Sequence, residues 1–193
     1  MTKWLSHRMV ERGIIKEEEQ ELYQFGICNG MILLLNVVTA LVIGLLTEQL
    51  AVVAVFTLSF MVLRSYTGGY HSDSRIFCYL GSNLVLLVPV YTQAVFYKTS
   101  LAWLLAVLLV SAGIIFLLSP MHSKNRKLDK EEQKHFGRKA RLIAVLELAV
   151  LGILWHAGQI PYAYAVYTGI CITALFMLVG KAQLWIQSHT ENG

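Results

Sequence analysis

Charged residues are scarce in this chain: only 15% of its 193 residues are Asp, Glu, Lys or Arg, while 56% are hydrophobic. A soluble domain needs more charge than this to cover its surface. The composition therefore excludes an ordinary soluble enzyme and favours a protein embedded in a lipid bilayer. The length suits one domain, 1–193, because lipid covers most of the apolar surface and no large buried core is required.

Cysteine is rare as well. The three cysteines are Cys28, Cys78 and Cys171, an odd number that argues against a disulfide framework. No repeat with a clear period is present. The first 24 residues are polar and lack the apolar centre of a secretory leader, so we expect no signal peptide.

Long apolar runs are what the chain has instead. Each is about 16 to 22 residues long, near the length that a helix needs to cross the hydrocarbon, and each is continuous, which favours helices over barrel strands. We predict an all-α, polytopic integral membrane helix bundle with about six transmembrane helices. Two runs are short, so four spans with two re-entrant segments are the alternative. The predicted spans are 26–46, 49–64, 76–97, 101–119, 140–157 and 161–181.

The basic residues predict an orientation. With six spans, 15 of the 16 Lys and Arg residues fall on one side of the membrane and only Lys98 falls on the other. The positive-inside rule then puts both termini, the loop 65–75 and the loop 120–139 in the cytoplasm. The net charge of +4 is thus explained by topology. We do not expect nucleic-acid binding.

An amphipathic segment is expected before the first span. Six apolar side chains fall roughly on one helical face, although Gly13 weakens the pattern. This favours a helix lying in the cytoplasmic membrane interface, with a solvated arm as the alternative. The six residues are Trp4, Leu5, Met9, Ile15, Leu22 and Tyr23.

The polar stretch RSYTGGYHSDSRIFC, residues 64–78, joins the second and third spans and holds unusual side chains. Gly68 and Gly69 allow a sharp turn, after which a side chain of residues 72–74 can cap the next helix. Cys78 then lies one to two turns inside that helix. A helix N-terminus favours negative charge nearby, and therefore favours a thiolate.

His71 can act on Cys78 only if the loop curls. On one straight helix, seven residues would separate the two by about 10 Å, too far for a hydrogen bond. Folded back over the helix end, the imidazole reaches the thiol and gives a nucleophile with its base, which later protonates the leaving amine. The alternatives are an apolar filler cysteine and an interfacial histidine. We expect no metal site, because the usual ligand spacings are missing.

Together, Arg64, the pair Gly68–Gly69, His71 and Cys78 resemble the AgrB (accessory gene regulator protein B) family of bacterial membrane cysteine endopeptidases in quorum sensing. The stretch LSPMHSKNRKLDKEEQ is similar to the family's segment after its fourth hydrophobic run. The resemblance implies that Cys78 is the nucleophile and His71 the base, and that Arg64 and Gly69 are needed for activity. For Arg64 we expect substrate binding or structural support.

The resemblance also implies a reaction. The C-terminal tail of an AgrD-like propeptide would be cleaved by Cys78, leaving a thioester acyl-enzyme that a propeptide cysteine attacks to give a thiolactone autoinducing peptide. No cofactor is implied. The expected partners are the propeptide, membrane lipids and a second copy of the chain in a homodimer. The active site is expected near the cytoplasmic face of the cell membrane, and the basic stretch 124–141 is expected to attract an acidic tail or anionic lipid.

Three further polar residues lie in or near the predicted spans. Ser82, one helical turn after Cys78, either orients a group in the site or packs against another helix. Asp73 either orients His71 or caps the helix. Glu147 lies inside the fifth span, where a carboxylate is costly and often functional, but we do not assign it a catalytic role.

Two other classes of protein compete with a peptidase. A small membrane peptide transporter or exporter predicts several intramembrane polar residues along a path, and often an internal repeat. The sequence has one intramembrane acid and no evident repeat. A non-enzymatic membrane scaffold predicts that His71 and Cys78 both tolerate alanine. Replacing Cys78 separates these classes.

Overall fold

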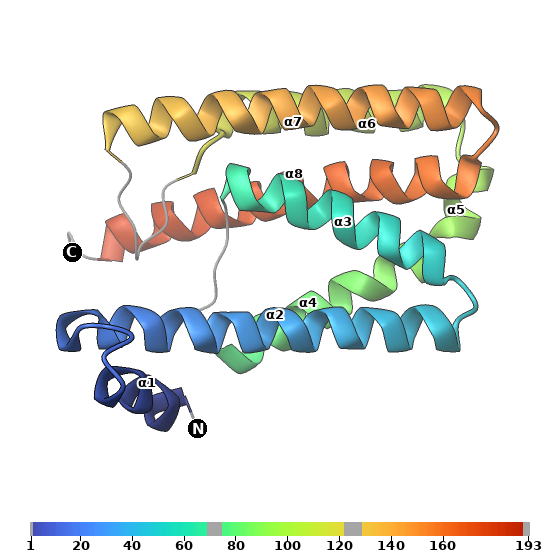
Figure 1. Cartoon of the computed structure of the whole chain (residues 1–193). Helices are drawn as coiled ribbons and strands as arrows, with labels where there is room; N and C mark the ends of the chain where they lie inside the picture. The colour runs from blue at the N-terminus through green and yellow to red at the C-terminus, as the bar shows by residue number, and fades with distance from the viewer. Residues whose placement is uncertain (1, 69–74, 122–128, 191–193) are drawn as a thin grey trace. The chain divides into compact units, whose positions relative to one another are not determined.

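The computed structural model describes residues 2–68, 75–121 and 129–190, and the regular elements in these ranges are all helices. The predicted all-α fold class is therefore confirmed. The helices are α1 (Thr2–Glu11), the short 3-10 helix η1 (Glu17–Glu19), α2 (Gln20–Leu46), α3 (Leu50–Thr67), α4 (Arg75–Tyr91), α5 (Gln93–Lys98), α6 (Leu101–Leu118), α7 (Lys130–His156) and α8 (Ile160–Thr190) (Figure 1).

Four helices are long and apolar enough to cross a membrane by length and composition. They correspond to the first, second, fourth and sixth predicted spans, so the chain is a polytopic helical membrane protein. The apolar part of α4 is shorter, and α7 has a charged first half, so the count of six spans stays a prediction. The four segments are Gly26–Leu46, Leu50–Thr67, Leu101–Leu118 and Ile160–Ile186.

The third predicted span, 76–97, is interrupted rather than continuous. The helix α4 ends at Tyr91, and α5 begins at Gln93 after Thr92, whose ψ is 0°. Proline has no backbone N–H, so Pro89 removes one helical hydrogen bond shortly before the break. The Thr92 hydroxyl donates to the Val88 carbonyl oxygen at 2.8 Å and supports the helix end.

Half of the predicted polar loop 120–139 is helical. The side chain of Asp129 accepts hydrogen bonds from the backbone N–H groups of Glu131 and Glu132, at 3.0 and 2.8 Å, and so caps the start of α7. An acidic cap and two acidic residues in the first turn also suit the positive end of the helix dipole.

The chain forms two compact units, Met1–Thr39 and Ala40–Gly193. In the first unit, α1 ends at Glu11 and Gly13 has a φ of +66°. The apolar face expected over residues 4–23 is therefore not carried by one continuous helix, because the left-handed glycine turns the chain.

Within α1, the exposed Trp4 side chain lies beside Arg8, whose guanidinium carbon is 5.1 Å from the ring centroid. Tryptophan is enriched at membrane–water interfaces. This pairing is compatible with the interfacial position expected for the segment.

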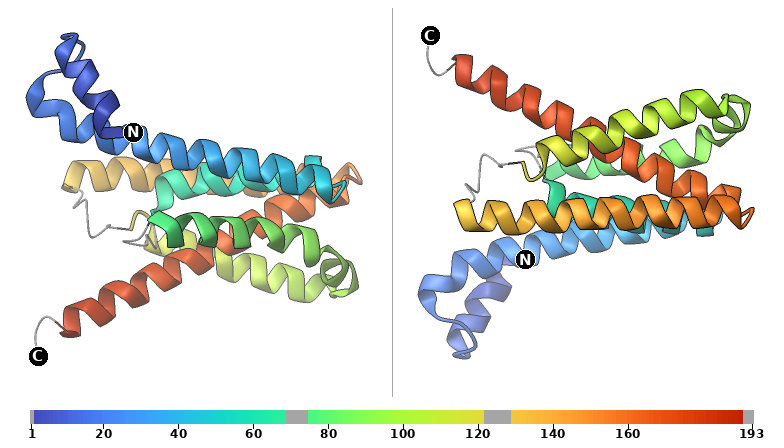
Figure 2. Two further views of the ribbon diagram at one scale, coloured as in Figure 1. Left: turned by 90° about the horizontal axis from the view of Figure 1, so that it is seen from below. Right: turned by 90° about the horizontal axis from the view of Figure 1, so that it is seen from above.

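The helix α8 is the centre of the second unit. It packs against α3, α6 and α7, and Figure 2 shows it running between α6 on one side and α3 and α7 on the other. Of its apolar window 67% is buried, against 17% for α6. A central helix surrounded by helices with exposed apolar faces is the arrangement expected where lipid covers the outside. The most buried core side chains include Phe56, Leu63, Ile115, Ile170 and Met177.

Small residues let α3 and α8 approach closely. A Cβ atom added at Gly169 would lie 2.5 Å from the Ser59 hydroxyl oxygen. The same hydroxyl donates to Oε2 of Glu147 on α7 at 2.7 Å. Close contact through small residues and a hydrogen bond between helices are both typical of membrane helix packing. The intramembrane acid of the sequence thus links α7 to α3.

One end of the second unit gathers the polar connections. Figure 1 shows the last turns of α3, α6 and α8 and the first turns of α4 and α7 at this end, which we call the basic end. The first half of α7 presents exposed Lys134, Arg138 and Arg141 here, and Lys98 ends α5 at the other end. This separation agrees with the charge sorting predicted from the sequence. That the basic end faces the cytoplasm stays a prediction.

Candidate active site

Arg64 lies in the last turn of α3, at the basic end, and is half-buried. Its Nη1 atom donates to the carbonyl oxygen of Gly68 at 2.6 Å. Its guanidinium carbon lies 5.1 Å from the ring centroid of Phe176 on α8. The two contacts hold the guanidinium against the end of its own helix. This geometry favours structural support for the helix end, one of the two roles expected for Arg64.

Gly68 makes the turn that ends α3. Its φ of +71° and ψ of −152° belong to a region that only glycine adopts readily. There is also no room for a side chain, because an added Cβ would lie 2.7 Å from the carbonyl oxygen of Met121. The sharp turn predicted from the paired glycines is therefore present at Gly68. Gly69 lies outside the described residues.

A backbone hydrogen bond joins the chain leaving α3 to the chain leaving α6. The N–H of Met121 donates to the carbonyl oxygen of Thr67 at 2.9 Å, and Thr67 is fully buried. We call this bond, together with the contact between Gly68 and Met121, the α3–α6 junction. The junction fixes the direction in which the chain leaves α3 toward residue 69.

The first half of α7 packs over the junction. A Cβ added at Gly137 would lie 3.0 Å from the ring of Pro120. The rings of Tyr66 and Phe136 are 6.3 Å apart between centroids, within the range of favourable aromatic pairs. The end of α3, the segment after α6 and the polar half of α7 thus form one packed cluster.

Cys78 is the fourth residue of α4, so its backbone lies on the first turn of that helix. Its side chain lies outside the described part of the structure, as do His71, Asp73 and the other residues of 69–74. Ser82 follows one turn later in α4 and is half-buried. The distance between the thiol and the imidazole, and the position of Ser82 relative to them, stay predictions.

Metal ligands do not gather in the part of the chain that the structure describes. Within those residues, no three His, Cys, Asp or Glu side chains lie close enough to hold one ion. The described part of the site contains the turn at Gly68, the guanidinium of Arg64 and the basic face of α7. These features position a loop and attract negative charge.

Three participants in this cluster were missed from the sequence: Thr67, Met121 and Gly137. Proline at 120 and glycine at 137 are weak signals of close packing or a chain turn. The residues around these positions do not indicate which distant part of the chain each one contacts.

Comparisons with known proteins agree with the resemblance seen in the motif. The family model described as accessory gene regulator B matches residues 1–178. An AgrB-like protein of Clostridium perfringens strain SM101 is 23% identical over 148 residues, which are 74% of this chain and 69% of that protein. AgrB-like protein 2 of strain 13 of that species is 24% identical over 131 residues, 65% of this chain and 61% of that protein.

A third relative is accessory gene regulator protein B of Staphylococcus intermedius. It is 27% identical over 121 residues, which are 63% of this chain and 62% of that protein. The matches to the second and third relatives thus span about three fifths of their length. No solved structure matches the chain.

Proposed function

The chain belongs to the accessory gene regulator B family, and we propose that it is a membrane cysteine endopeptidase that processes a peptide pheromone precursor. Membership ties the chain to accessory gene regulator quorum sensing. The proposed substrate is an AgrD-like propeptide. The observation that carries the proposal is the pattern of Arg64, Gly68–Gly69, His71 and Cys78 inside the matched range, with Arg64 and Gly68 held at the end of α3.

In the proposed reaction, the Cys78 thiolate attacks a backbone carbonyl carbon of the propeptide. His71 takes the thiol proton and returns it to the nitrogen of the leaving tail, so the peptide bond breaks as the thioester forms. A cysteine of the propeptide then attacks the thioester. Its sulfur replaces that of Cys78, which closes a thiolactone ring and restores the free enzyme.

The two steps differ in energy. Exchange of one thioester for another is nearly neutral and needs no nucleotide. Formation of the first thioester from an amide is unfavourable in free energy, so removal of the tail or the product has to shift the equilibrium toward the thioester. A site that excludes water protects the thioester from hydrolysis. An apolar bundle with its polar connections at one end is suited to this.

The described contacts support a positioning role for Arg64 and Gly68 in this scheme. The guanidinium of Arg64 holds the Gly68 carbonyl at 2.6 Å, and Met121 holds the neighbouring Thr67 carbonyl at 2.9 Å. Loss of either contact frees the chain just before His71. We therefore expect such changes to lower the rate of cleavage more than the binding of the propeptide.

The experiment is intact-mass spectrometry of the purified protein in lipid, mixed with the small propeptide encoded beside it. Wild type is compared with Cys78→Ala, His71→Ala and, as the matched control, Cys171→Ala on α8. We expect tail release and an acyl adduct in wild type and the control, and neither in the other two variants.

Two outcomes would contradict the proposal. Unchanged tail release in Cys78→Ala would remove the nucleophile assignment. Transport of an intact peptide into sealed vesicles without cleavage, retained in Cys78→Ala, would identify a transporter instead.

A further inference from the structure

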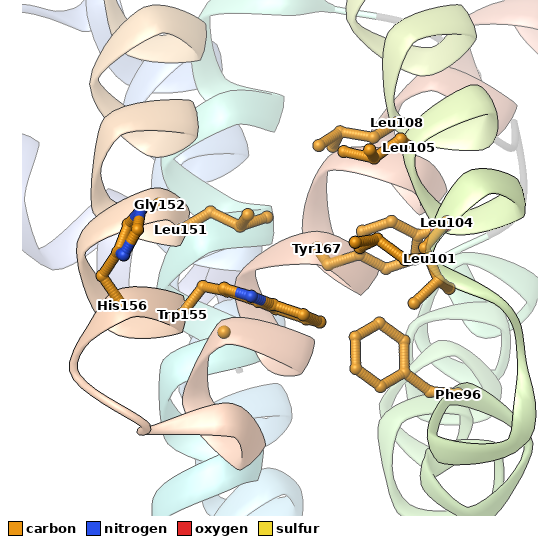
Figure 3. Close-up of a pocket in the computed structure, with 11 residues that line it drawn as sticks. Phe96, Leu101, Leu104, Leu105, Leu108, Leu151, Gly152, Trp155, His156 and Tyr167 are labelled. Carbon is orange, nitrogen blue, oxygen red and sulfur yellow. The ribbon is translucent and has the colours of Figure 1, made fainter.

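A cavity of about 270 Å³ lies at the end of the second unit opposite the candidate active site. It separates the first half of α6 from the last turns of α7, and α8 forms its floor. Figure 3 shows leucine side chains of α6 on one wall and Leu151, Gly152 and Trp155 of α7 on the other, with Tyr167 of α8 between them.

The cavity runs along the helices and opens toward the outside of the bundle. Its wall on α6 begins with Leu101 and Leu105, which are 54% and 48% exposed, and ends at Leu108, which is buried. Leu101 and Leu108 are seven residues apart, about 10 Å along a helix axis. Since α6 is long and apolar enough to span a membrane, we interpret the cavity as a slot leading from the lipid-facing surface into the bundle.

The lining changes in character along the slot. At the end of α7 it contains Trp155 and His156, whose amphipathic rings suit the level of the lipid headgroups. Deeper in the bundle the wall on α6 consists of leucines. Exposed Lys98, which ends α5 close to the lining residue Phe96 in sequence, adds a cation at the headgroup end.

We propose that this slot binds one acyl chain of a phospholipid from the leaflet opposite the candidate active site, with the headgroup level with His156. The hydrocarbon tail of an acyl chain carries no polar atom, so its burial against the leucine wall leaves no hydrogen-bonding group unsatisfied. A peptide would bury amide groups there without enough hydrogen-bond partners, which is unfavourable.

A bound acyl chain would also stabilise the packing of α6 against α7. At the basic end, the Arg141 Nε atom donates to the Phe116 carbonyl oxygen at 3.2 Å. At the opposite end the cavity lies between the two helices. A chain in the slot supplies the missing dispersion contacts to both walls. The proposal does not depend on the chemistry at Cys78.

The test fills the slot from within the protein. A Cβ added at Gly152 meets no atom within 4 Å, so Gly152→Leu places a side chain in the slot without a backbone clash. The matched control is Gly113→Leu on α6, where an added Cβ also meets no atom within 4 Å and which does not line this cavity.

The probe is phosphatidylglycerol with a photoreactive diazirine in its acyl chain, in nanodiscs, with adducts located by mass spectrometry. We expect wild type and Gly113→Leu to carry adducts on the buried Leu108 as well as on the outward-facing Leu109. Gly152→Leu should lose the Leu108 adduct and keep the Leu109 adduct.

Three results would overturn the proposal. Absence of the Leu108 adduct in wild type would do so even if Gly152→Leu failed to fold. An unchanged Leu108 adduct in a folded Gly152→Leu variant would show that the lipid reaches Leu108 by another route. Displacement of the Leu108 adduct by added propeptide would identify a peptide as the occupant.

Discussion

Replacing Gly68 with alanine tests the α3–α6 junction directly. The new Cβ would lie 2.7 Å from the Met121 carbonyl oxygen, and the residue would have to keep a φ of +71° and a ψ of −152°. Neither demand can be met without movement of the backbone. Since Met121 is bound to Thr67 next to this position, we expect the movement to break that hydrogen bond.

The size of the effect follows from two terms. A non-glycine residue held in this backbone region costs about 1–3 kcal/mol. The lost backbone hydrogen bond adds about 0.5–1.5 kcal/mol. The junction should thus be destabilised by about 1.5–4.5 kcal/mol. Because each 1.4 kcal/mol is a factor of ten, it should open roughly 10 to 1,600 times more often.

Hydrogen–deuterium exchange measures this opening. The exchange of the Met121 amide is obtained by difference between a peptide that ends at Met121 and one that ends at Pro120, which has no amide proton of its own. The matched control is Gly81→Ala in α4, where an added Cβ meets no atom within 4 Å. If the Met121 amide exchanged equally slowly in Gly68→Ala and in Gly81→Ala, the junction as described would be wrong.

Three smaller changes give further tests. Gly169→Ala should lower the free energy of unfolding by about 1–3 kcal/mol, because its Cβ would lie 2.5 Å from the Ser59 hydroxyl. Thermal unfolding in detergent measures this loss, and a stability equal to that of wild type would contradict it. Ser59→Ala should cost more stability than Glu147→Gln, which keeps an acceptor for the Ser59 hydroxyl, and the reverse order in the same assay would refute the bond. Arg64→Lys keeps the charge but cannot keep both the hydrogen bond to the Gly68 carbonyl and the contact with the Phe176 ring. The kcat of propeptide cleavage should therefore fall while KM stays nearly unchanged. A change in KM alone would instead indicate that Arg64 binds the substrate.

Local patterns predicted the helices well where one physical cause dominated. The bilayer fixes the length of an apolar run, so the spans at 26–46, 49–64, 101–119 and 161–181 correspond closely to helices. The prediction was less complete where causes competed. Pro89 and Thr92 interrupt the run 76–97, because a missing backbone N–H weakens the helix whatever the hydropathy.

The candidate site shows the same division. The glycine pair predicted a sharp turn after α3, and Gly68 makes that turn because a backbone conformation is a local property. The atom that leaves no room beside Gly68 belongs to Met121, more than fifty residues away. No pattern around either residue could have paired them.

Glu147 is a comparable case. Its position in an apolar run marked it from the sequence as a residue that needs a partner. The partner is Ser59 on α3, and no local pattern around Glu147 points to that serine.

The sequence by itself determined the all-helical membrane fold, the basic end and the family, because run length, charge and short motifs are properties of neighbouring residues. Only the tertiary structure decided that the ends of α3 and α6 meet, that Arg64 holds Gly68 while Glu147 bonds Ser59, and that a slot separates α6 from α7. Those contacts depend on how whole helices pack against one another, and packing is set by the shapes of side chains far apart in the chain.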